Sequence, residues 1–266
     1  MTVNHIHPTA IIHKTAIVHP GAKLGARVNI GSYSIIGEHV EIGDDTRIGA
    51  HVVIDGHTRI GSANRIFQFC SLGEIPQDKK YNDEPTRLDI GDRNVIREFC
   101  TFNIGTVQDA GVTRIGSDNW IMAYVHIAHD CQIGNHTIFA NNASLAGHVQ
   151  VGDYAVLGGF TGVHQFCRVG AHVMTGISTV VFKDIPPFVM AAGQPATPHG
   201  INTEGLKRRG MSVDALSTLK QAYKIVWREG LTVTDALTKL SELSPVTAEV
   251  AALSAFLAVP GRGIIR

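Results

Sequence analysis

The sequence has no surplus of either charge and few aromatic side chains. Its 266 residues include 23 Lys or Arg and 23 Asp or Glu, so the formal net charge is zero. A nucleic-acid-binding protein needs a basic surplus to neutralise phosphates, so this balance argues against that class. Aromatic residues make up only 6% and glycine contributes 28 residues, so we expect a core of small and branched side chains in one or two domains.

Long hydrophobic segments are also missing. No apolar run approaches the roughly 18 residues that would indicate a transmembrane helix. Residues 1–5 lack the basic region followed by an apolar stretch that marks a secretion signal. We therefore expect a cytoplasmic protein without stable membrane insertion.

An aliphatic residue recurs at every sixth position through much of the chain. Each such residue, called an anchor below, is Ile, Leu or Val from Ile6 to Leu72; the series resumes at Ile90, shifts phase by one residue at Ile115 and fades near Val181. Because six is even, an anchor and the small or branched residue two positions before it face the same side of a strand. This period excludes an α-helix and predicts short strands joined by tight corners and stacked as a solenoid.

The repeat has frequent glycines after its anchors and two segments that interrupt it. Glycine often follows the anchor, and we expect it to supply the unusual backbone angles of a corner. Two polar segments, near residues 73–89 and 103–114, contain no anchors at the expected spacing. They are predicted to leave the solenoid as loops, which often carry function when a rigid scaffold holds them.

The repeat resembles that of the hexapeptide-repeat acyltransferases. The resemblance implies a mainly β fold, a left-handed parallel β-helix with three strands per coil, over residues 1–190. The handedness follows from the family alone, since the general rule for parallel crossovers favours the right-handed form. Three repeats make one coil of 18 residues, and successive coils lie about 4.8 Å apart.

The C-terminal part follows a different period. Apolar spacing predicts an amphipathic helix over residues 212–229 with Ser212 as its N-cap, followed by helices over 232–243 and 247–258. Residues 191–266 are therefore predicted to form an α-helical domain. The charge also changes from −3 in residues 1–185 to +3 in the remainder. A basic helical domain could dock an acidic partner, although a solvated surface explains three charges equally well.

The four cysteines share one place in the repeat, two residues before an anchor. This is the inward position of a strand, and no Cys-x-x-Cys motif is present. We expect buried, inert core thiols rather than disulfides or zinc ligands. They are Cys70, Cys100, Cys131 and Cys167.

One histidine-rich segment differs from the others, most of which fall at outward corners. Moving one coil along the solenoid stacks His129 beneath Gly147 and Asp130 beneath His148, so glycine leaves space beside the His129 ring. Imidazole titrates near pH 6.5 and suits a general base, which Asp130 could orient. We expect five residues to gather on one edge within three stacked coils, about 10 Å from the first coil to the third: His126, His129, Asp130, His148 and His164.

Four strings of residues make a more specific resemblance. HIAHDC from His126, AGH from Ala146, VHQF from Val163 and NTEGLKRRG from Asn202 resemble the UDP-N-acetylglucosamine O-acyltransferases of lipid A synthesis. The likeness spans nearly the whole chain. It implies transfer of a 3-hydroxyacyl group from acyl carrier protein to the 3-hydroxyl of UDP-N-acetylglucosamine, the first step of lipid A biosynthesis. It also implies a homotrimer with sites between subunits and no metal or redox cofactor.

The same resemblance implies roles for individual residues. His129 is the expected general base, Asp130 its support, and the Gly147 N–H the expected oxyanion donor. The residues expected to hold the sugar and the diphosphate are Asp78, Lys80, His126, His148 and His164. Those expected to complete the nucleotide site are Gln165, Asn202, Glu204 and Arg208.

The chain departs from the family pattern in two places. Asn103 and Ile104 stand where relatives commonly have His-Arg, so any substrate contact by that histidine is absent or replaced by the Asn103 amide. Ile177 follows Gly176 where some relatives have a second glycine. In the family this region limits the acyl chain, so we predict a preference below about 14 carbons, since a branched side chain shortens the groove.

Three other functions stay open at this stage. A short-chain transferase of the same fold would use acetyl-coenzyme A, but the helical extension favours a protein donor. A zinc hydratase resembling the γ-class carbonic anhydrases would bind zinc through three histidines between subunits. An ice-binding or scaffolding β-helix would carry a regular array of Thr or charge on one face, which the sequence does not contain.

Overall fold

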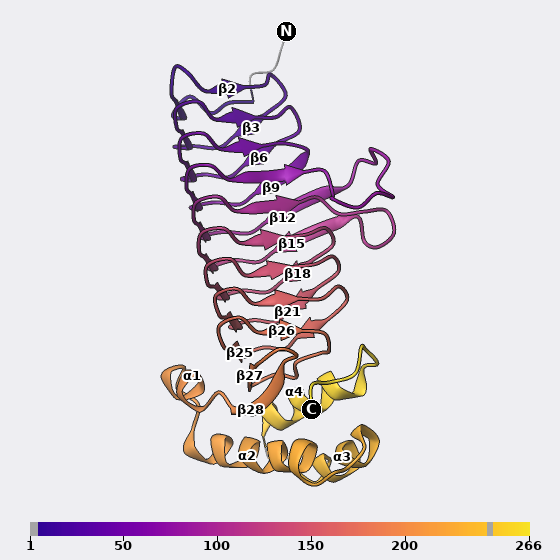
Figure 1. Cartoon of the computed structure of the whole chain (residues 1–266). Coiled ribbons are helices and arrows are strands. Elements are labelled where there is room, and N and C mark those ends of the chain that lie inside the picture. The colour runs from indigo at the N-terminus through magenta and orange to yellow at the C-terminus, as the bar shows by residue number, and fades with distance from the viewer. Residues whose placement is uncertain (1–4, 244–246) are drawn as a thin grey trace.

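The computed structural model describes residues 5–243 and 247–266. The chain winds into a parallel β-helix, and α-helices pack at its C-terminal end (Figure 1). The β-strands form three sheets along the helix axis, named below by their 11, 9 and 8 strands.

Most strands are two residues long and end at an anchor. The 11-stranded sheet contains, in spatial order, β1 (Ile11–Ile12), β4 (Asn29–Ile30), β7 (Arg47–Ile48), β10 (Arg65–Ile66), β13 (Val95–Ile96), β16 (Trp120–Ile121), β19 (Ile138–Phe139), β22 (Val156–Leu157), β25 (Met174–Thr175), β27 (Val189–Ala192) and β28 (Thr197–Ile201). The 9-stranded sheet contains β2 (Ile17–Val18), β5 (Ile35–Ile36), β8 (Val53–Ile54), β11 (Ser71–Glu74), β14 (Thr101–Asn103), β17 (His126–Ile127), β20 (Ser144–Leu145), β23 (Gly162–Val163) and β26 (Val180–Val181). The 8-stranded sheet contains β3 (Lys23–Leu24), β6 (Glu41–Ile42), β9 (His57–Ile60), β12 (Arg87–Ile90), β15 (Val112–Ile115), β18 (Gln132–Ile133), β21 (Gln150–Val151) and β24 (Arg168–Val169).

The register confirms the 18-residue coil. Ile12 pairs with Ile30 on the next coil, and each anchor from Leu24 onward in the N-terminal coils is buried. Leu72 instead pairs with Phe102, and Phe102 with Ile127, because each of these two coils contains an extra loop. The loops cover residues 75–86 and 104–111, inside the two predicted segments, and both connect the 9-stranded to the 8-stranded sheet.

The unusual backbone angles of the corners do not fall on the glycines that follow the anchors, as was predicted, but on another residue. At most corners from Leu24 onward, the residue three positions after an anchor has a positive φ although it is not glycine; examples are Arg27 at 57° and Asp130 at 59°. Among the glycines that directly follow the predicted anchors, only Gly73 has a positive φ. A Cβ on Gly31 would lie 2.5 Å from the carbonyl carbon of Gly49 on the next coil. The predicted reason was therefore wrong for most of these glycines, which are small so that stacked coils can approach each other.

The inside of the β-helix is filled by anchors and small residues. All four cysteines are free and buried, as predicted. Burial raises the pKa of the Cys131 thiol to about 12, so this sulfur stays protonated. The outward corner between the 11-stranded and 9-stranded sheets carries a ladder of stacked rings: Tyr33, His51, Phe69, Phe99 and Tyr124.

The C-terminal part begins with a hairpin rather than a helix. β27 and β28 pair antiparallel and extend the 11-stranded sheet across the predicted domain boundary. The helices are α1 (Thr203–Arg208), α2 (Val213–Arg228), α3 (Val233–Leu240) and α4 (Ala248–Ala258). The sequence predicted the last three, and the Ser212 side chain accepts a hydrogen bond from the Ala215 N–H as the expected N-cap of α2. α1 was not predicted.

A buried ion pair ties the helices to the last coil. The Arg168 guanidinium lies 2.7 Å from the Asp184 carboxylate, donates to the Val259 carbonyl and covers the Phe256 ring. The backbone carbonyl of Asp184 also accepts a hydrogen bond from the Ile265 N–H, which holds the C-terminal segment in place. None of the described helices is both long enough and apolar enough to cross a membrane.

Candidate active site

One edge of the β-helix gathers most of the predicted site residues. At this edge the chain passes from the 9-stranded sheet to the 8-stranded sheet. We call it the loop edge because both loops leave the β-helix here. Residues 128–130, 146–148 and 164–166 form the corners of three successive coils on this edge. The expected gathering of His129, Asp130 and His148 is therefore found.

His129 and Asp130 form a hydrogen-bonded pair. The His129 Nδ1 donates to the Asp130 Oδ2 at 2.9 Å, and Asp130 is only 2% exposed. The Thr106 backbone N–H and hydroxyl also donate to this carboxylate, the hydroxyl at 2.7 Å. Burial by itself would raise the pKa of Asp130, but the hydrogen bonds from His129 and Thr106 outweigh it and hold the pKa below its ordinary value. The carboxylate is therefore ionised at neutral pH.

Gly147 provides the space beside the His129 ring. A Cβ at this position would lie 2.5 Å from the Cε1 and 2.7 Å from the Nε2 of His129. No other residue type fits without moving the imidazole. Within the described residues, no acceptor is recorded for the Gly147 N–H, although its carbonyl accepts from Phe166.

His148 lies against both members of this pair. Its ring meets the His129 ring edge-on at 5.0 Å and stacks on Phe166 at 4.4 Å. The His148 Nδ1 donates to the Asp109 Oδ2 at 2.9 Å, and its Nε2 lies 3.9 Å from the Asp130 Oδ2. The ring is thus held with Nε2 toward the pair.

His126 and His164 flank this group. The His126 Nδ1 is hydrogen-bonded to the Thr101 hydroxyl at 2.8 Å, and burial lowers the pKa of His126. The His164 Nδ1 donates to the carbonyl of Gln165, whose side chain is exposed. Both histidines belong to the loop edge or to the strand that leads into it.

The loop of residues 75–86 brings Asp78 and Lys80 to the same edge. The Lys80 N–H donates to the Asp78 carboxylate at 3.0 Å, and the Lys80 side chain is exposed. The Asn103 amide donates to the carbonyls of Glu74 and Ile75 and so holds the base of this loop. Its NH₂ group is committed there, while its buried Oδ1 has no hydrogen-bond partner among the residues that the structure describes.

Asn202, Glu204 and Arg208 lie on another side of the molecule. They line a groove of about 680 Å³ between α1 and the outer face of the 11-stranded sheet. In Figure 1, α1 and the loops project on opposite sides of the β-helix. The Asn202 side chain accepts the Gly205 N–H and donates to the His172 carbonyl, so it caps α1. A single chain does not bring these three residues to His129.

Comparisons with known proteins decide the family. A family model described as UDP-N-acetylglucosamine O-acyltransferase, domain 2, matches residues 184–265, and a model of six bacterial transferase hexapeptides matches residues 21–56 and 113–147. The acyl-(acyl-carrier-protein)–UDP-N-acetylglucosamine O-acyltransferase of Thiobacillus denitrificans is 72% identical over 98% of this chain and 99% of its own length. That of Herminiimonas arsenicoxydans is 57% identical over 98% and 99%. The chain belongs to the UDP-N-acetylglucosamine O-acyltransferase family.

Solved structures of the UDP-N-acetylglucosamine O-acyltransferase family match over the same length. The enzyme from Acinetobacter baumannii is 46% identical, covers 98% of this chain and 99% of its own, and gives a TM-score of 0.89. The enzyme from Campylobacter jejuni is 38% identical, covers 96% and 98%, and gives 0.90. The fold is the parallel β-helix that the repeat predicted, with the left-handed coil that the resemblance implied, and the predicted class of enzyme, an acyltransferase, is confirmed.

One arrangement in this acyltransferase could also suit a metal ion. Ligand atoms of His129, Asp130 and His148 lie within 4.8 Å of one another. However, the Asp130 Oδ2 already accepts hydrogen bonds from His129 and from the Thr106 hydroxyl, and both oxygens accept the Thr106 N–H. A carboxylate whose Oδ2 is engaged in this way favours an acid–base pair over a zinc ligand.

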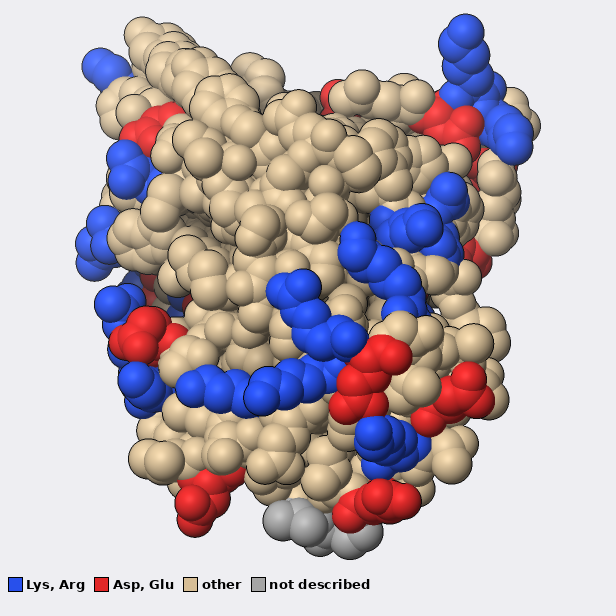
Figure 2. Space-filling view, turned by 60° about the horizontal axis from the view of Figure 1, so that its bottom comes forward, with Lys and Arg blue, Asp and Glu red and all other residues tan. Residues whose placement is uncertain are grey.

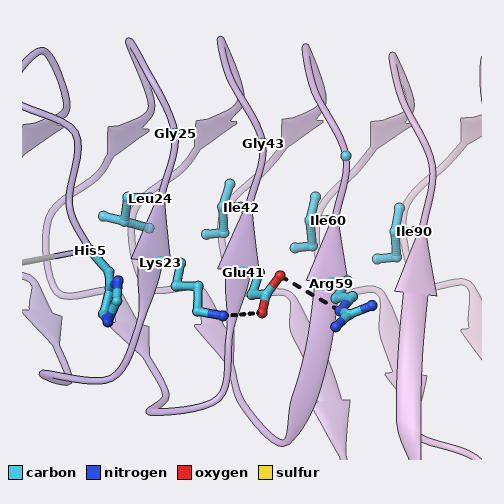
Figure 3. Close-up of a pocket in the computed structure, with 11 residues that line it drawn as sticks. His5, Lys23, Leu24, Gly25, Glu41, Ile42, Gly43, Arg59, Ile60 and Ile90 are labelled. Atoms are coloured by element: carbon cyan, nitrogen blue, oxygen red, sulfur yellow. Dashed lines mark hydrogen bonds and ion pairs between the residues drawn. The ribbon is translucent and has the colours of Figure 1, made fainter. Parts of the chain in front are cut away.

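A second hollow lies far from these residues, on the outside of the N-terminal coils. It has a volume of about 500 Å³ and is lined by Lys23, Glu41 and Arg59 together with aliphatic anchors and glycines (Figure 3). Lys23 lies 2.7 Å and Arg59 3.6 Å from the Glu41 carboxylate. None of the predicted site residues lines this hollow, and such exposed ion pairs contribute little stability.

The sequence interpretation of the acyltransferase missed three residues that hold the site. Thr101 bonds His126, Thr106 bonds Asp130, and Asp109 bonds His148. Thr106 and Asp109 belong to a loop that has no place in the repeat, so adding 18 to a residue number could not locate them.

Proposed function

We propose that this chain transfers a 3-hydroxyacyl group from acyl carrier protein to the 3-hydroxyl of UDP-N-acetylglucosamine, with His129 as the general base. The observation that carries the proposal is the His129–Asp130 pair at 2.9 Å beside Gly147. A carboxylate can only accept here, so the proton of neutral His129 resides on Nδ1. The lone pair of Nε2 is then free to take a proton from an alcohol.

The reaction follows from these positions. The His129 Nε2 takes the proton of the sugar 3-hydroxyl as the oxygen attacks the thioester carbonyl carbon. The resulting oxyanion accepts a hydrogen bond from the Gly147 N–H. The carbon–sulfur bond then breaks, the imidazolium returns the proton to the thiolate, and the carrier thiol leaves. A positioned base contributes about 10²–10⁴ in rate and an oxyanion donor about 10²–10³.

Asp130 supports this base without exchanging its proton. Its ionised carboxylate fixes the tautomer of His129 and stabilises the imidazolium that forms during attack. Its depressed pKa keeps it ionised well below neutral pH. We propose that Asp78, Lys80, His126, His148, His164 and Gln165 hold the sugar, the diphosphate and part of the nucleotide along the loop edge.

The nucleotide site is completed by Glu204 and Arg208 of a neighbouring subunit in a homotrimer. The two groups of residues lie on different sides of one chain, and packing of identical subunits around a threefold axis would let the α1 groove of one face the loop edge of the next. The exposed rings of Tyr33 and Phe99 support such packing, since monomers seldom expose contiguous apolar stripes. Asn202 contributes by capping α1.

The acyl donor reaches the site along the helical end of the molecule. Lys220, Lys224 and Arg228 line a groove of about 420 Å³ on α2, and Figure 2 shows lysine and arginine side chains gathered across this end. An acidic carrier protein fits this charge. Reversing Lys220 and Lys224 to Glu is expected to raise KM for the carrier thioester at least tenfold and leave KM for the sugar nucleotide unchanged. The same reversal at the distant Lys14 is the control.

Ile177 is proposed to shorten the acyl groove. This residue is 74% exposed at the corner between the 11-stranded and 9-stranded sheets, a different edge from the loop edge, so in the proposed trimer it would meet an acyl chain bound at the loop edge of a neighbouring subunit. We expect the highest rate with carrier thioesters shorter than about 14 carbons, and Ile177→Gly to move the optimum toward longer chains. A clear optimum at about 14 carbons in the unaltered enzyme would contradict this assignment.

The central experiment is a carrier-thioester assay on His129→Ala. We expect turnover to fall at least a hundredfold, at the lower end of general-base contributions, while circular dichroism and the melting temperature stay unchanged. His39→Ala, an exposed histidine on the same edge, is the control and should keep its turnover. Near-normal turnover of His129→Ala would refute the base. Activity with coenzyme A thioesters but not with carrier thioesters would refute the donor.

A further inference from the structure

The loop of residues 104–111 reaches both imidazole groups of the site from outside the repeat. Near its start, Thr106 donates two kinds of hydrogen bond to Asp130, which holds His129. Near its end, the Asp109 carboxylate accepts from the His148 Nδ1 at 2.9 Å. The Gly105 N–H donates to the Arg87 carbonyl and the Thr86 hydroxyl to the Gly105 carbonyl, so the base of the loop is fixed.

His148 needs such a contact because, among the described residues, no other group forms a hydrogen bond with its ring; the Asp130 Oδ2 lies 3.9 Å from the His148 Nε2, beyond hydrogen-bond distance. Stacking on Phe166 at 4.4 Å and edge contact with His129 at 5.0 Å stay similar if the imidazole turns over by half a rotation. Only the position of the nitrogens changes. The Asp109 carboxylate, which can only accept, requires an N–H on Nδ1 and thereby directs Nε2 toward the pair.

We propose that Asp109 is a positioning residue of the acyltransferase, which acts through His148. By holding Nδ1, it presents the His148 Nε2 to the acceptor sugar beside the His129 Nε2. Asp109 itself is half exposed at the mouth of the site and does not touch the reacting atoms. This inference rests on the proposed function for its kinetic consequence, but the geometry of the ring can be tested separately.

The first test reads the His148 ring directly. Nitrogen NMR of histidine-labelled protein distinguishes the protonated from the unprotonated ring nitrogen. We expect the N–H of neutral His148 on Nδ1 in the unaltered protein, and loss of this preference in Asp109→Ala. Asp109→Asn retains a carbonyl oxygen as acceptor and should keep the Nδ1 form. An unchanged His148 spectrum in Asp109→Ala would overturn the proposal whether or not the enzyme uses His129 as a base.

The second test is kinetic. Asp109→Ala is expected to raise KM for UDP-N-acetylglucosamine five- to twentyfold, with a smaller change in kcat and an unchanged melting temperature. Asp109→Asn should recover most of this loss. Gln108→Ala, the exposed neighbour in the same loop, is the matched control and should change KM less than twofold.

The decisive comparison is a double-mutant cycle. In the absence of the His148 ring, Asp109 has nothing to position, so Asp109→Ala is expected to have no further effect on His148→Ala. Additive losses would show that Asp109 acts elsewhere and would overturn the proposal. Failure of the proposed function is recognised separately, because it would appear as normal turnover of His129→Ala.

Discussion

The N-terminal coils and the coils from Leu72 onward share one geometry but place very different groups on the same edge. In the N-terminal coils, His39 and His57 occupy the corner position, stack at 4.5 Å and are exposed. In the later coils, Asp130 and His148 occupy that same position, and the loop of residues 104–111 covers them. The repeat alone thus places imidazole rings on the edge. A chemical site needs a partner carboxylate and a loop that buries and orients both.

The largest effect is expected at Gly147, the glycine beside the His129 ring in the later coils. Gly147→Ala places a Cβ within 2.7 Å of the His129 Nε2, so the imidazole must move from its position. We expect kcat to fall about 10²–10⁴-fold, as for loss of a positioned general base, because alanine keeps the backbone N–H but displaces the His129 ring. The measurement is steady-state turnover with the carrier thioester.

The control for Gly147→Ala is Gly162→Ala, because a Cβ at Gly162 meets no atom within 4 Å. It should keep most of its turnover. Equal turnover of both variants would mean that the space beside His129 has no role in the reaction.

The second effect contrasts ion pairs at the two ends of the β-helix. Asp184→Ala removes a buried carboxylate and leaves the mostly buried Arg168 without its partner, which should lower the free energy of unfolding by about 3–5 kcal/mol. Glu41→Ala removes an exposed pair with Lys23 and should cost less than about 1 kcal/mol. Urea denaturation monitored by circular dichroism compares them. Similar losses would show that the Arg168–Asp184 pair does not fasten the helices.

A smaller effect is expected at the loop that distinguishes the later coils. Thr106→Val removes one hydroxyl donor from Asp130 and keeps the backbone N–H, which should cost about 1 kcal/mol of stability and up to about tenfold in turnover. The pKa of Asp130 should rise toward its ordinary value, so activity and stability are lost at a higher pH as the solution is acidified. The pH profile of kcat checks this. An unshifted acid limb would exclude Thr106 as a support of the carboxylate.

The smallest effect concerns His126. Burial lowers the pKa of this group in the folded chain, so the unfolded chain binds a proton at higher pH. The group therefore leaves stability unaffected above about pH 6.5 and reduces it as the pH falls from there through the folded pKa. His126→Asn should make the free energy of unfolding less dependent on pH in this range. Unfolding curves at several pH values test it, and identical slopes would contradict the burial of a titrating ring.

The sequence predicted much of the fold because the same few atoms recur at a fixed spacing. Anchors such as Ile30 and Ile48 occupy the predicted inward positions, and the three longer C-terminal helices follow their apolar period. α1 has only six residues, too few for a period to show, and it begins at the Asn202 cap. Glycine after the anchor was predicted correctly as a structural requirement but for the wrong reason, since a close approach between coils leaves no local trace in the sequence.

The candidate site was also predicted only in part from the sequence. Stacking by 18 residues located His129, Gly147 and His148 together, and the resemblance supplied the family that the comparisons confirm. The roles of these residues, the three-subunit assembly and the cytoplasmic location stay predictions. Glu204 and Arg208 were expected to complete a nucleotide site between subunits, and one chain holds them on another side from the histidines.

By itself, the sequence determined the β-helix, its coil length and the edge on which imidazole groups collect, because hydrophobic burial acts through a short and regular period. Only the tertiary structure decided which groups bind one another on that edge. Thr106 and Asp109 reach Asp130 and His148 across 24 and 39 residues through a loop outside the repeat. Such contacts depend on the path of the loop in space, and no spacing along the chain encodes that path.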